Sequence, residues 1–545
     1  MRPGLAIVVF SINRSIMKQI ITALLWISCL SVYGQYQAPS GPWVESAESL
    51  GALITGEGLK EHLSILASDE FEGRETGQPG QRLAAEYIAK VFEGYGMPRV
   101  VGDSSYFQKI AFTAEGWNRI ALVLNGESYR HLWDYYAYPS TNAAMPETSF
   151  EEVLFLGYGI ESERYNDYKG VDVKGKAILI YDGEPVDASG TSRVTGTQQL
   201  SDWAKDWRRK LRLAREKGAS LVLVIDGNFK QNVAEARRAI FNTGLQYGEG
   251  ENPEQNYANN CFITTKVAKE ILGGEYKKVI RARKNMQKKG KSKALPLSCQ
   301  LTLQLDKFKR QVLGENVLGY IEGTDEKRKD ELLVITAHYD HLGRRGSSIY
   351  NGADDNGSGT STVLEVAEAF AAAKKQGIGP RRSVLLMLVS GEEKGLLGSQ
   401  YYVEHPVFPL ESTIADINVD MVGRVDEKHK DNPEYIYVIG SDRMSTELHQ
   451  INEQANATYT KLELDYTYNA DDDPNRYYYR SDHYNFAERG IPAIFYFNGT
   501  HPDYHRTSDT VDKIQFDKMA KIGQLVFYTA WELANREERI KVDVK

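Results

Sequence analysis

The sequence predicts an α/β protein in which a mostly parallel sheet lies between helices and is interrupted by an inserted β-rich domain. The 545 residues exceed one compact domain, since roughly 150 residues per unit gives about three to four units. The composition, 26% charged and 41% hydrophobic, is that of a folded soluble protein and excludes disordered, collagen-like and polytopic membrane proteins. After Gln311 the chain alternates strand-like and helix-like segments, which indicates a parallel sheet.

Residues 1–34 are predicted to be a leader with a signal peptide. Met17 and Lys18 precede an apolar run, Ile20–Leu30, and small or medium residues follow up to Gly34, as signal peptidase requires. The run is shorter than the about 20 apolar residues of a membrane helix. We therefore expect an exported protein, periplasmic or extracellular, without stable membrane insertion, rather than a permanently anchored one. Lipid modification at Cys29 is a minor alternative.

Residues 35–118 are predicted to form the amino-terminal part of the main domain. Apolar residues recur at helical spacing within residues 58–96, on both sides of the loop Glu72–Gly77, which predicts a pair of helices. We expect this pair to cap the main domain.

Residues 119–308 are predicted to form the insert. In this segment the sequence pattern changes to short strand-like runs, with one predicted helix at residues 210–217. The segment 277–293 carries nine basic residues and no acidic one. We expect a solvated helix face and loop there rather than a polyanion site, because most charge runs are solvated.

Residues 309–545 are predicted to complete the main domain. The strand Leu332–Ile335 precedes a polar loop, residues 360–373 form an amphipathic helix, and Ser383–Val389 is an apolar strand. This order predicts a parallel sheet with helices on both faces, and ligand sites in such sheets lie at the carboxyl ends of the strands.

Charge and cysteine content exclude several functions. The net charge of -8 gives no global reason to bind nucleic acid or an anionic membrane. After leader removal Cys261 and Cys299 are left, too few for a disulfide scaffold or a thiolate zinc site, although one pairing between them is left open. A serine hydrolase is disfavoured because the chain has no Gly-x-Ser-x-Gly motif.

Clusters of acidic and imidazole side chains follow separate apolar strand candidates. Such groups are costly to bury without a metal or a partner. Imidazole and carboxylate together suit zinc, cobalt or manganese better than calcium. A metal pair about 3.5–4 Å apart needs a bridging carboxylate and about two further ligands per ion. The clusters supply five candidates: His338, Asp355, Glu393, Asp420 and His505.

One further acid, Glu392, is placed to take the proton of an attacking water. In an extended strand, adjacent side chains such as those of Glu392 and Glu393 point in opposite directions. Both can face the same cleft only at a strand end or in a turn, and Gly391 gives the backbone the freedom to turn there. Asp340, two residues after His338, is expected to hold the second ring nitrogen of that imidazole.

These clusters resemble the motifs of a known family, the di-zinc exopeptidases of the bacterial leucyl aminopeptidase and glutamate carboxypeptidase type. The similarity is strong over about residues 310–535, and Leu66–Arg74 is similar to the family's amino-terminal part. Residues Gly157–Ile160 and Gly175–Lys176 make the insert similar to a protease-associated domain. The motifs are AHYDH (337–341), GADDNGSG (352–359), SGEEKGLLGS (390–399), NVDMVGR (418–424) and DYHRTSDT (503–510).

The resemblance implies the phosphorylase/peptidase-like zinc exopeptidase fold and two Zn²⁺ per chain. Asp355 would bridge the ions and be followed by a cis peptide bond. His338 and Asp420 would complete one site, and Glu393 and His505 the other. The implied general base is Glu392, and Tyr504 matches a position whose phenol stabilises the oxyanion in some members.

The remaining polar residues near the motifs receive lesser roles. Ser481–His483 is interpreted as a substrate wall or as support behind the ligands. His341 and His501 are not implied as ligands, although His501 is the competitor of His505. The other histidines are expected to be solvated. The tyrosines at 466, 468 and 477–479 are interpreted as a substrate-facing loop.

The implied activity is that of a metallo-aminopeptidase acting on peptide substrates, in which Glu392 activates water for attack on the first peptide bond. A carboxypeptidase of the same family would need a basic residue, such as Arg424 or Arg480, aimed at the substrate carboxylate. A glutaminyl cyclase works with one zinc and fits less well. A non-catalytic receptor-like module would lack a ligand or the base, and none is missing.

Overall fold

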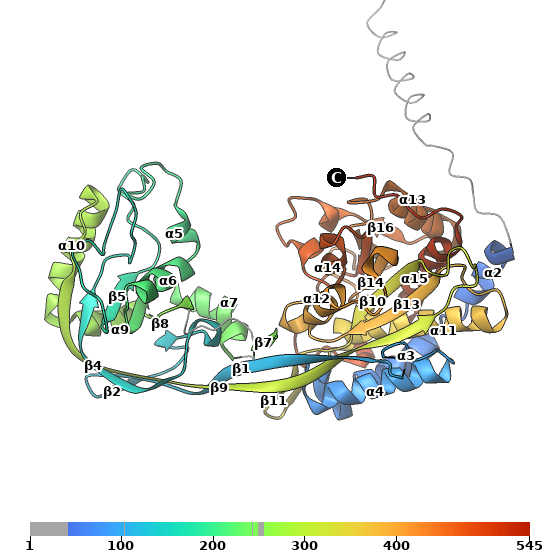
Figure 1. Cartoon of the computed structure of the whole chain (residues 1–545), viewed down its shortest axis with the longest axis horizontal. Helices are drawn as coiled ribbons and strands as arrows, with labels where there is room; N and C mark the ends of the chain where they lie inside the picture. Colours follow the sequence, from blue (N-terminus) through green and yellow to red (C-terminus); the bar gives the residue numbers. More distant parts are fainter. Residues whose placement is uncertain (1–41, 103, 242–243, 249–255, 545) are drawn as a thin grey trace, which may run out of the picture.

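Two lobes make up the protein, and two long strands join them (Figure 1). The computed structural model describes residues 42–544 except 103, 242–243 and 249–255, so the predicted leader lies outside the described residues. The joining strands are β1 (Phe107–Leu124) and β9 (Leu295–Ile321). We call residues 42–106 and 322–544 the large lobe, and residues 125–294 the distal lobe.

A mixed, mostly parallel sheet forms the centre of the large lobe. Strands β14, β10 and β13 are parallel neighbours, β17 is parallel to β14, and β9 runs antiparallel to β13. The predicted fold class is confirmed. In spatial order the strands are β16 (Glu463–Asp465), β15 (Tyr435–Ile439), β17 (Ala493–Phe497), β14 (Thr413–Val419), β10 (Leu332–His338), β13 (Ser383–Val389) and β9.

Helices cover both faces of this sheet, which explains why all seven residues of β10, β13 and β14 are buried. Alternate residues of β10 belong to different cores: Leu333 and Ile335 pack with α3, α4, α11, α13 and α15, whereas Leu332 and Val334 pack with α12 and α14. The helices are α2 (Pro42–Gly51), α3 (Gly56–Leu66), α4 (Pro79–Gly94), α11 (Gly359–Lys375), α12 (Leu397–Glu404), α13 (Thr446–Ala455), α14 (His483–Glu488) and α15 (Phe516–Asn535).

The predicted amino-terminal helix pair is confirmed as α3 and α4, but the amphipathic prediction for α11 is wrong. Twelve of the 17 residues of α11 are buried. The helix lies between the sheet on one side and α3 and α15 on the other, so it has almost no solvent face.

Hydrogen bonds from Arg74 connect the segment between α3 and α4 to the carboxyl edge of the sheet. Its guanidinium is buried and donates to four backbone carbonyls, those of Leu66, Tyr339, Asn351 and Gly352, at 2.6–2.9 Å. Because a guanidinium has donors in a fixed fork, it can satisfy carbonyls on three chain segments at once.

The distal lobe holds the continuation of the same sheet, which passes from β9 to β4, and it is richer in helix than predicted. Strands β4, β5, β6 and β8 are parallel neighbours, with a core on each face. Its strands are β2 (Glu127–Tyr129), β3 (Tyr135–Tyr136), β4 (Met145–Phe155), β5 (Ala177–Tyr181), β6 (Leu221–Ile225), β7 (Gly244–Tyr247) and β8 (Asn259–Ile263). Its helices are α5 (Asp202–Lys205), α6 (Arg208–Glu216), α7 (Phe229–Phe241), α9 (Thr265–Leu272) and α10 (Tyr276–Lys289).

The two cysteines left open for pairing do not form a disulfide. Cys261 and Cys299 are free and lie buried in the same apolar core of the distal lobe. Burial raises the pKa of Cys261 above its usual range and that of Cys299 to about 11. Both side chains therefore act as small apolar groups.

The strands β1 and β9 pair with each other along nearly their whole length. The register runs from Phe107 opposite Val317 to Leu124 opposite Leu301, with one irregularity between Trp117 and Arg119. The expected domain boundaries at 118/119 and 308/309 both fall inside this two-stranded ribbon. Strand β7 adds to β1 and brings Tyr247 against Tyr401 of α12 in the large lobe.

A buried carboxyl group lies inside the helical layer, away from the strand ends. Glu365 of α11 is 3% exposed, accepts a hydrogen bond from the backbone N–H of Thr55 at 3.3 Å and has His62 Nε2 at 3.6 Å. Burial raises the pKa of Glu365 to about 7 and lowers the pKa of His62 to about 4. At mildly acidic pH both side chains are therefore neutral.

We expect Glu365→Gln to stabilise the protein at pH 8 but not at pH 4.5. The folded-state pKa of Glu365 lies above the unfolded value of 4.5, so the native state binds the extra proton and this stability is lost as pH rises from 4.5 through 7. The shift corresponds to a gain on the order of 3 kcal/mol at pH 8 for the variant. Urea unfolding at both pH values measures it, with Glu86→Gln on the exposed face of α4 as control. Equal midpoints for wild type and Glu365→Gln at pH 8 would contradict the raised pKa.

Candidate metal centre

The candidate residues meet at the carboxyl edge of the parallel strands. His338 is the last residue of β10, Asp420 follows β14 directly, and Glu392 and Glu393 lie in the turn after β13. Asp355 comes from the turn that precedes α11. His505 lies in the loop after β17. Because β14, β10 and β13 are neighbours, their ends bring these side chains together, as is usual for ligand sites in such sheets.

Two groups of donors can hold a metal ion. The first contains His341, Asp355, Glu393 and His505, and the second contains His338, Glu392 and Asp420. Within each group the donor atoms lie within 4.8 Å of one another. The five residues predicted as ligands are all present, together with the predicted base and one histidine, His341, that the sequence did not indicate.

Asp355 connects the two groups because its two carboxylate oxygens face different partners. Oδ2 lies 2.7 Å from His505 Nε2 and 3.7 Å from His341 Nδ1. Oδ1 lies 3.5 Å from His338 Nε2. A carboxylate in this position can bridge two cations.

Several of these atoms converge without hydrogen-bond geometry. Glu393 Oε1 lies 2.9 Å from His341 Nδ1 and 3.1 Å from His505 Nε2. Nevertheless Glu393 Oε1, Asp355 Oδ2 and both ring nitrogens of His341 are buried polar atoms without a hydrogen-bond partner among the described residues. Buried polar atoms are rarely left in this way. Converging nitrogen and carboxylate donors fit a borderline cation such as zinc.

The electrostatics of the centre also indicate that it needs positive charge. Burial alone would raise the pKa of Glu393, yet the imidazoles of His505 and His341 outweigh burial and hold that pKa well below its usual value. Burial opposes charge on His505 too, but Glu393 and Asp355 raise its pKa to about 9. The carboxylates stay ionised by gathering cationic partners, and a metal ion supplies the same charge.

Glu392 behaves differently from its neighbour. Burial raises its pKa well above the usual range, although His338 works against this shift, and Asp420 and Glu393 add to it. Its Oε2 lies 3.9 Å from His338 Nε2. The two acids of the Glu-Glu pair therefore differ in proton affinity, as an acid–base group and a ligand should.

The backbone around the centre has the expected special conformations. Gly391 has φ 87° and opens the turn that carries both glutamates, and the Asp355–Asn356 peptide bond is cis, as predicted. His505 also has a positive φ, of 56°. Such conformations of non-glycine residues cluster at functional sites.

The predicted role of the Asp340 carboxylate is wrong. His338 Nδ1 lies 3.1 Å from the backbone carbonyl oxygen of Asp340, whereas the carboxylate is 3.8 Å away. The carboxylate instead accepts hydrogen bonds from the hydroxyl of Thr76 at 2.8 Å and from the backbone N–H of Glu392 at 3.2 Å. Asp340 thus positions His338 through its main chain and the Glu392 turn through its side chain.

The predicted supporting role of the Ser481 turn agrees with its contacts. The Ser481 hydroxyl donates to Asp420 Oδ2 at 2.7 Å and accepts from the side-chain amide of Asn418 at 2.8 Å. His483 is fully buried, and burial lowers its pKa to about 3. These residues act behind the donors.

The structure places the other histidines differently from one another. His405 is exposed, as predicted, whereas His131 and His449 are half-buried. His501 is excluded as the competitor of His505, because its Nε2 faces Asp354 Oδ2 at 3.1 Å and it belongs to neither donor group. His62 and His429 were expected to be solvated, but both are largely buried. His429 lies between Asp426 and Asp465, at 2.8 and 3.1 Å.

The tyrosines predicted to form a substrate-facing loop mostly fill apolar cores instead. Tyr477 is 8% exposed and packs with Phe497 behind the strand ends, and Tyr468 packs against Tyr437 with tilted ring planes. Tyr479, at 38%, does face solvent. Tyr504 stacks on His505 with ring centroids 3.8 Å apart, which places it beside the donors.

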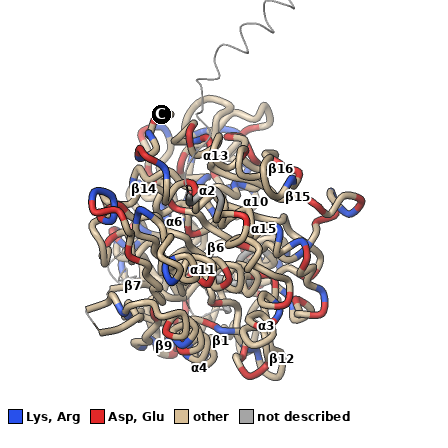
Figure 2. Tube along the Cα trace, turned by 90° about the vertical axis from the view of Figure 1, so that its right-hand side faces the viewer, with Lys and Arg blue, Asp and Glu red and all other residues tan. Residues whose placement is uncertain are grey.

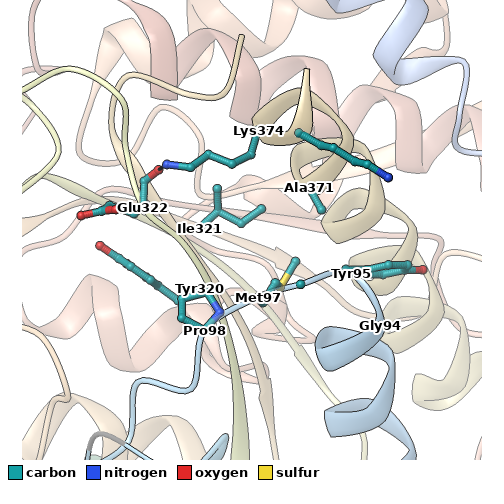
Figure 3. Close-up of a pocket in the computed structure, with 11 residues that line it drawn as sticks. Gly94, Tyr95, Met97, Pro98, Tyr320, Ile321, Glu322, Ala371 and Lys374 are labelled. Carbon is teal, nitrogen blue, oxygen red and sulfur yellow. Dashed lines mark hydrogen bonds between the residues drawn. The ribbon is translucent and has the colours of Figure 1, made fainter. Parts of the chain in front are cut away.

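A separate hollow of about 480 Å³ lies at the opposite edge of the sheet (Figure 3). It is lined by the end of α4, the end of β9 and the last turn of α11. Ile321 in its wall pairs with Val384, near the start of β13. Its lining contains one acidic residue, Glu322, and no histidine, so it does not belong to the candidate centre.

Comparison with known proteins agrees with this geometry. Residues 316–530 match the model of Peptidase family M28. "Aminopeptidase YwaD" of Bacillus subtilis (strain 168) is 28% identical over 261 residues, which are 47% of this chain and 52% of that protein. A "probable leucine aminopeptidase" of Arthroderma otae is 30% identical over 226 residues, 40% of this chain and 57% of that protein. The chain thus spans little more than half the length of these curated relatives.

Solved structures show the same fold. The aminopeptidase from Aneurinibacillus sp. strain AM-1 superposes with a TM-score of 0.57 at 18% identity, covering 92% of this chain and 98% of that one. A zinc aminopeptidase from Bacillus subtilis gives a TM-score of 0.52 at 19% identity, covering 90% and 99%. At this level of identity the likeness confirms the fold.

Proposed function

Since residues 316–530 match Peptidase family M28, we propose that the chain is a zinc-dependent exopeptidase that acts as an aminopeptidase on peptide substrates. The observation that carries the proposal is the pair of donor groups joined by Asp355. A two-zinc hydrolytic centre needs imidazole and carboxylate donors for the ions and one further acid as general base. This chain has these donors and, as the further acid, Glu392. The names of its relatives, aminopeptidases and zinc metalloproteases, support the same activity.

Two zinc ions per chain would be held with Asp355 between them. His338 and Asp420 would bind one ion, and Glu393 and His505 the other. Zinc in such a site would polarise the carbonyl group of the substrate. It would also lower the pKa of water, so that the water loses a proton readily and becomes a better nucleophile. His341, whose Nδ1 lies 2.9 Å from Glu393 Oε1, would support that carboxylate from behind the ligands.

Glu392 would accept the proton of the attacking water and pass it to the leaving amine. Its raised pKa suits a group that gains and loses a proton during the reaction. Tyr504 would donate a hydrogen bond to the oxyanion. Burial, together with Asp355 and Glu393, raises the pKa of Tyr504 far above its usual range, so its phenol stays protonated and available as a donor.

The choice of aminopeptidase over carboxypeptidase rests on the charges around the centre. Arg424 is held by Asp503 at 2.9 Å, which removes one cation from the candidates for binding a substrate carboxylate. Acidic side chains near the metal donors would attract the positively charged amino terminus of a peptide substrate. A carboxypeptidase is the second candidate because Arg480 has no ion pair among the described residues and lies close enough to Tyr504 for its charge to oppose the rise in the pKa of that phenol.

The segments outside the centre are assigned to export and to the two domains. We assign residues 1–34 to a leader that is removed. The protein is accordingly assigned to the periplasm or the extracellular space. No helix within the described residues is long and apolar enough to cross a membrane. We assign the insert, residues 119–308, to a protease-associated domain and residues 35–118 and 309–545 to the peptidase domain.

Glu392→Gln should keep its metal but lose two to four orders of magnitude, roughly, in kcat, the range for removal of a general acid–base group. The amide fills the same space and cannot accept the proton. Steady-state kinetics with zinc analysis measure both properties. Glu404→Gln, on the outer end of α12, is the control. Near-normal turnover by Glu392→Gln would remove this residue as the base.

Asp355→Ala should lose at least one of two bound zinc ions, because one carboxylate serves both donor groups. His505→Ala should also lose one ion. His341→Ala should retain both, with affinity lower by about 10–100-fold, as for residues that support a ligand. Zinc is counted by metal analysis after dialysis, with His405→Ala on α12's end as control. One zinc in the wild-type protein, or two in Asp355→Ala, would contradict the two-metal proposal.

Amino-acid p-nitroanilides should be hydrolysed, and a chelator should abolish this activity. Dipeptides with a blocked amine and a free carboxylate should not be cleaved, because an aminopeptidase requires the free amine. The two substrate classes are compared with and without chelator. Cleavage of the blocked dipeptides alone would reverse the choice in favour of the carboxypeptidase.

A further inference from the structure

Helix α10 lies on the outer edge of the distal lobe, on the side away from the large lobe (Figure 1). Three apolar residues, Val279, Ala282 and Met286, are buried against the lobe. They recur every three or four residues and so form one face of the helix. The opposite face of α10 is therefore turned to solvent.

That solvent face carries a row of cations, which we call the cationic stripe. Its members are exposed, and their spacing of four, three and four residues aligns them along one side of the helix. The stripe consists of Lys277, Arg281, Lys284 and Lys288. It runs for about 16 Å, at about 1.5 Å per residue.

The charge of the stripe is not compensated locally. Within residues 277–293 the structure shows an ion pair for Lys278, with Glu275, and none for the stripe. Because this segment holds nine basic residues and no acidic one in a chain of net charge -8, the rest of the chain carries a net -17. Cations and anions are interspersed over the face of the molecule in Figure 2. Like charges at helical spacing repel, so the stripe is unfavourable without a counter-charge.

A hollow of about 770 Å³ lies beside the stripe and shares two of its lysines, Lys284 and Lys288. Arg193 lines it from the facing loop. Its guanidinium is fixed by Asp187 at 2.9 Å and by the backbone carbonyls of Gln287 and Lys288 at 2.7 and 2.8 Å. The loop thus closes the hollow beside Lys284 and Lys288. Because Asp187 offsets the charge of Arg193, the net positive charge of this concave surface comes from the stripe.

We propose that the cationic stripe and this hollow bind a linear anionic polymer of the acidic polysaccharide type. A row of cations one helix wide matches a single chain of regularly spaced anions. An anionic membrane fits less well, because the apolar face of α10 is used in the lobe core and cannot insert between lipids. A nucleic acid fits less well, because the lining of the hollow contains no aromatic side chain on which bases stack.

This site is independent of the proposed peptidase activity and lies at the far end of the molecule from the candidate centre. A polymer held there would tether the distal lobe and leave the large lobe free to meet peptides. The binding free energy would come from the charges of the stripe. It should therefore fall steeply with salt, as for other polyanion sites.

The test uses the full chain and two probes, heparin for sulfated and polygalacturonate for carboxylated polysaccharides, in a series of NaCl concentrations. The triple variant Arg281→Glu, Lys284→Glu, Lys288→Glu should lose at least tenfold in affinity. The slope of log K against log salt should shrink by about two, at about 0.7 per lost contact. The matched control Lys60→Glu, Lys90→Glu, Lys375→Glu changes the net charge equally on exposed positions of the large lobe and should bind like wild type.

Three results would overturn the proposal. These are equal losses in both triple variants, absence of binding to both polysaccharides, and tighter binding to phosphatidylglycerol vesicles or to a single-stranded oligonucleotide than to either polysaccharide. Retention of p-nitroanilide hydrolysis and of the melting temperature shows that the variants are folded. If charge reversal disrupts α10, the neutral variant Arg281→Gln, Lys284→Gln, Lys288→Gln replaces it, with the same expected loss of affinity.

Discussion

The need to compensate buried negative charge around Asp355 organises this protein. Four strands of the large lobe end at one edge, and each is followed by acidic or imidazole side chains that the fold then encloses. Carboxylates in such a place stay ionised only beside positive charge or hydrogen-bond donors. Asp355 has imidazoles on both of its oxygens, and its backbone N–H donates to Asp509 at 3.2 Å. The chemistry proposed for the centre follows from this arrangement, because a cation that balances the charge also activates water.

The residues that hold the donors come from far along the chain. Arg74 and Thr76 lie more than 260 residues before Tyr339 and Asp340, yet Arg74 fixes the carbonyls of the strand ends and Thr76 orients the Asp340 carboxylate. That carboxylate in turn holds the backbone of the Glu392 turn. The amino-terminal segment is therefore part of the centre in a physical sense, although it supplies no donor atom.

The sequence predicts those features that depend on local pattern. Strands β10 and β13 were recognisable because burial on both faces leaves continuous apolar runs. His338 and Glu393 were recognisable because they follow such runs, and Asp355 and Asp420 because they stand in acidic clusters nearby. Features that depend on packing partners were missed. Nothing in the spacing of α11 shows that α3 and α15 cover its outer side, and nothing near His341 or His429 shows which carboxylates the fold brings to them. The orientation of Asp340 was missed for the same reason, since Thr76 competes for its side chain.

The paired strands β1 and β9 have a consequence for how such a chain can diversify. The chain leaves the large lobe at Phe107 and returns at Val317, and these two residues are directly opposite each other. A segment whose ends are adjacent partners in a ladder can be shortened, lengthened or exchanged without disturbing the register of the strands below it, because β9 keeps its own pairing to β13. The ribbon therefore separates the two lobes: the large lobe can keep its geometry while the segment between β1 and β9 changes.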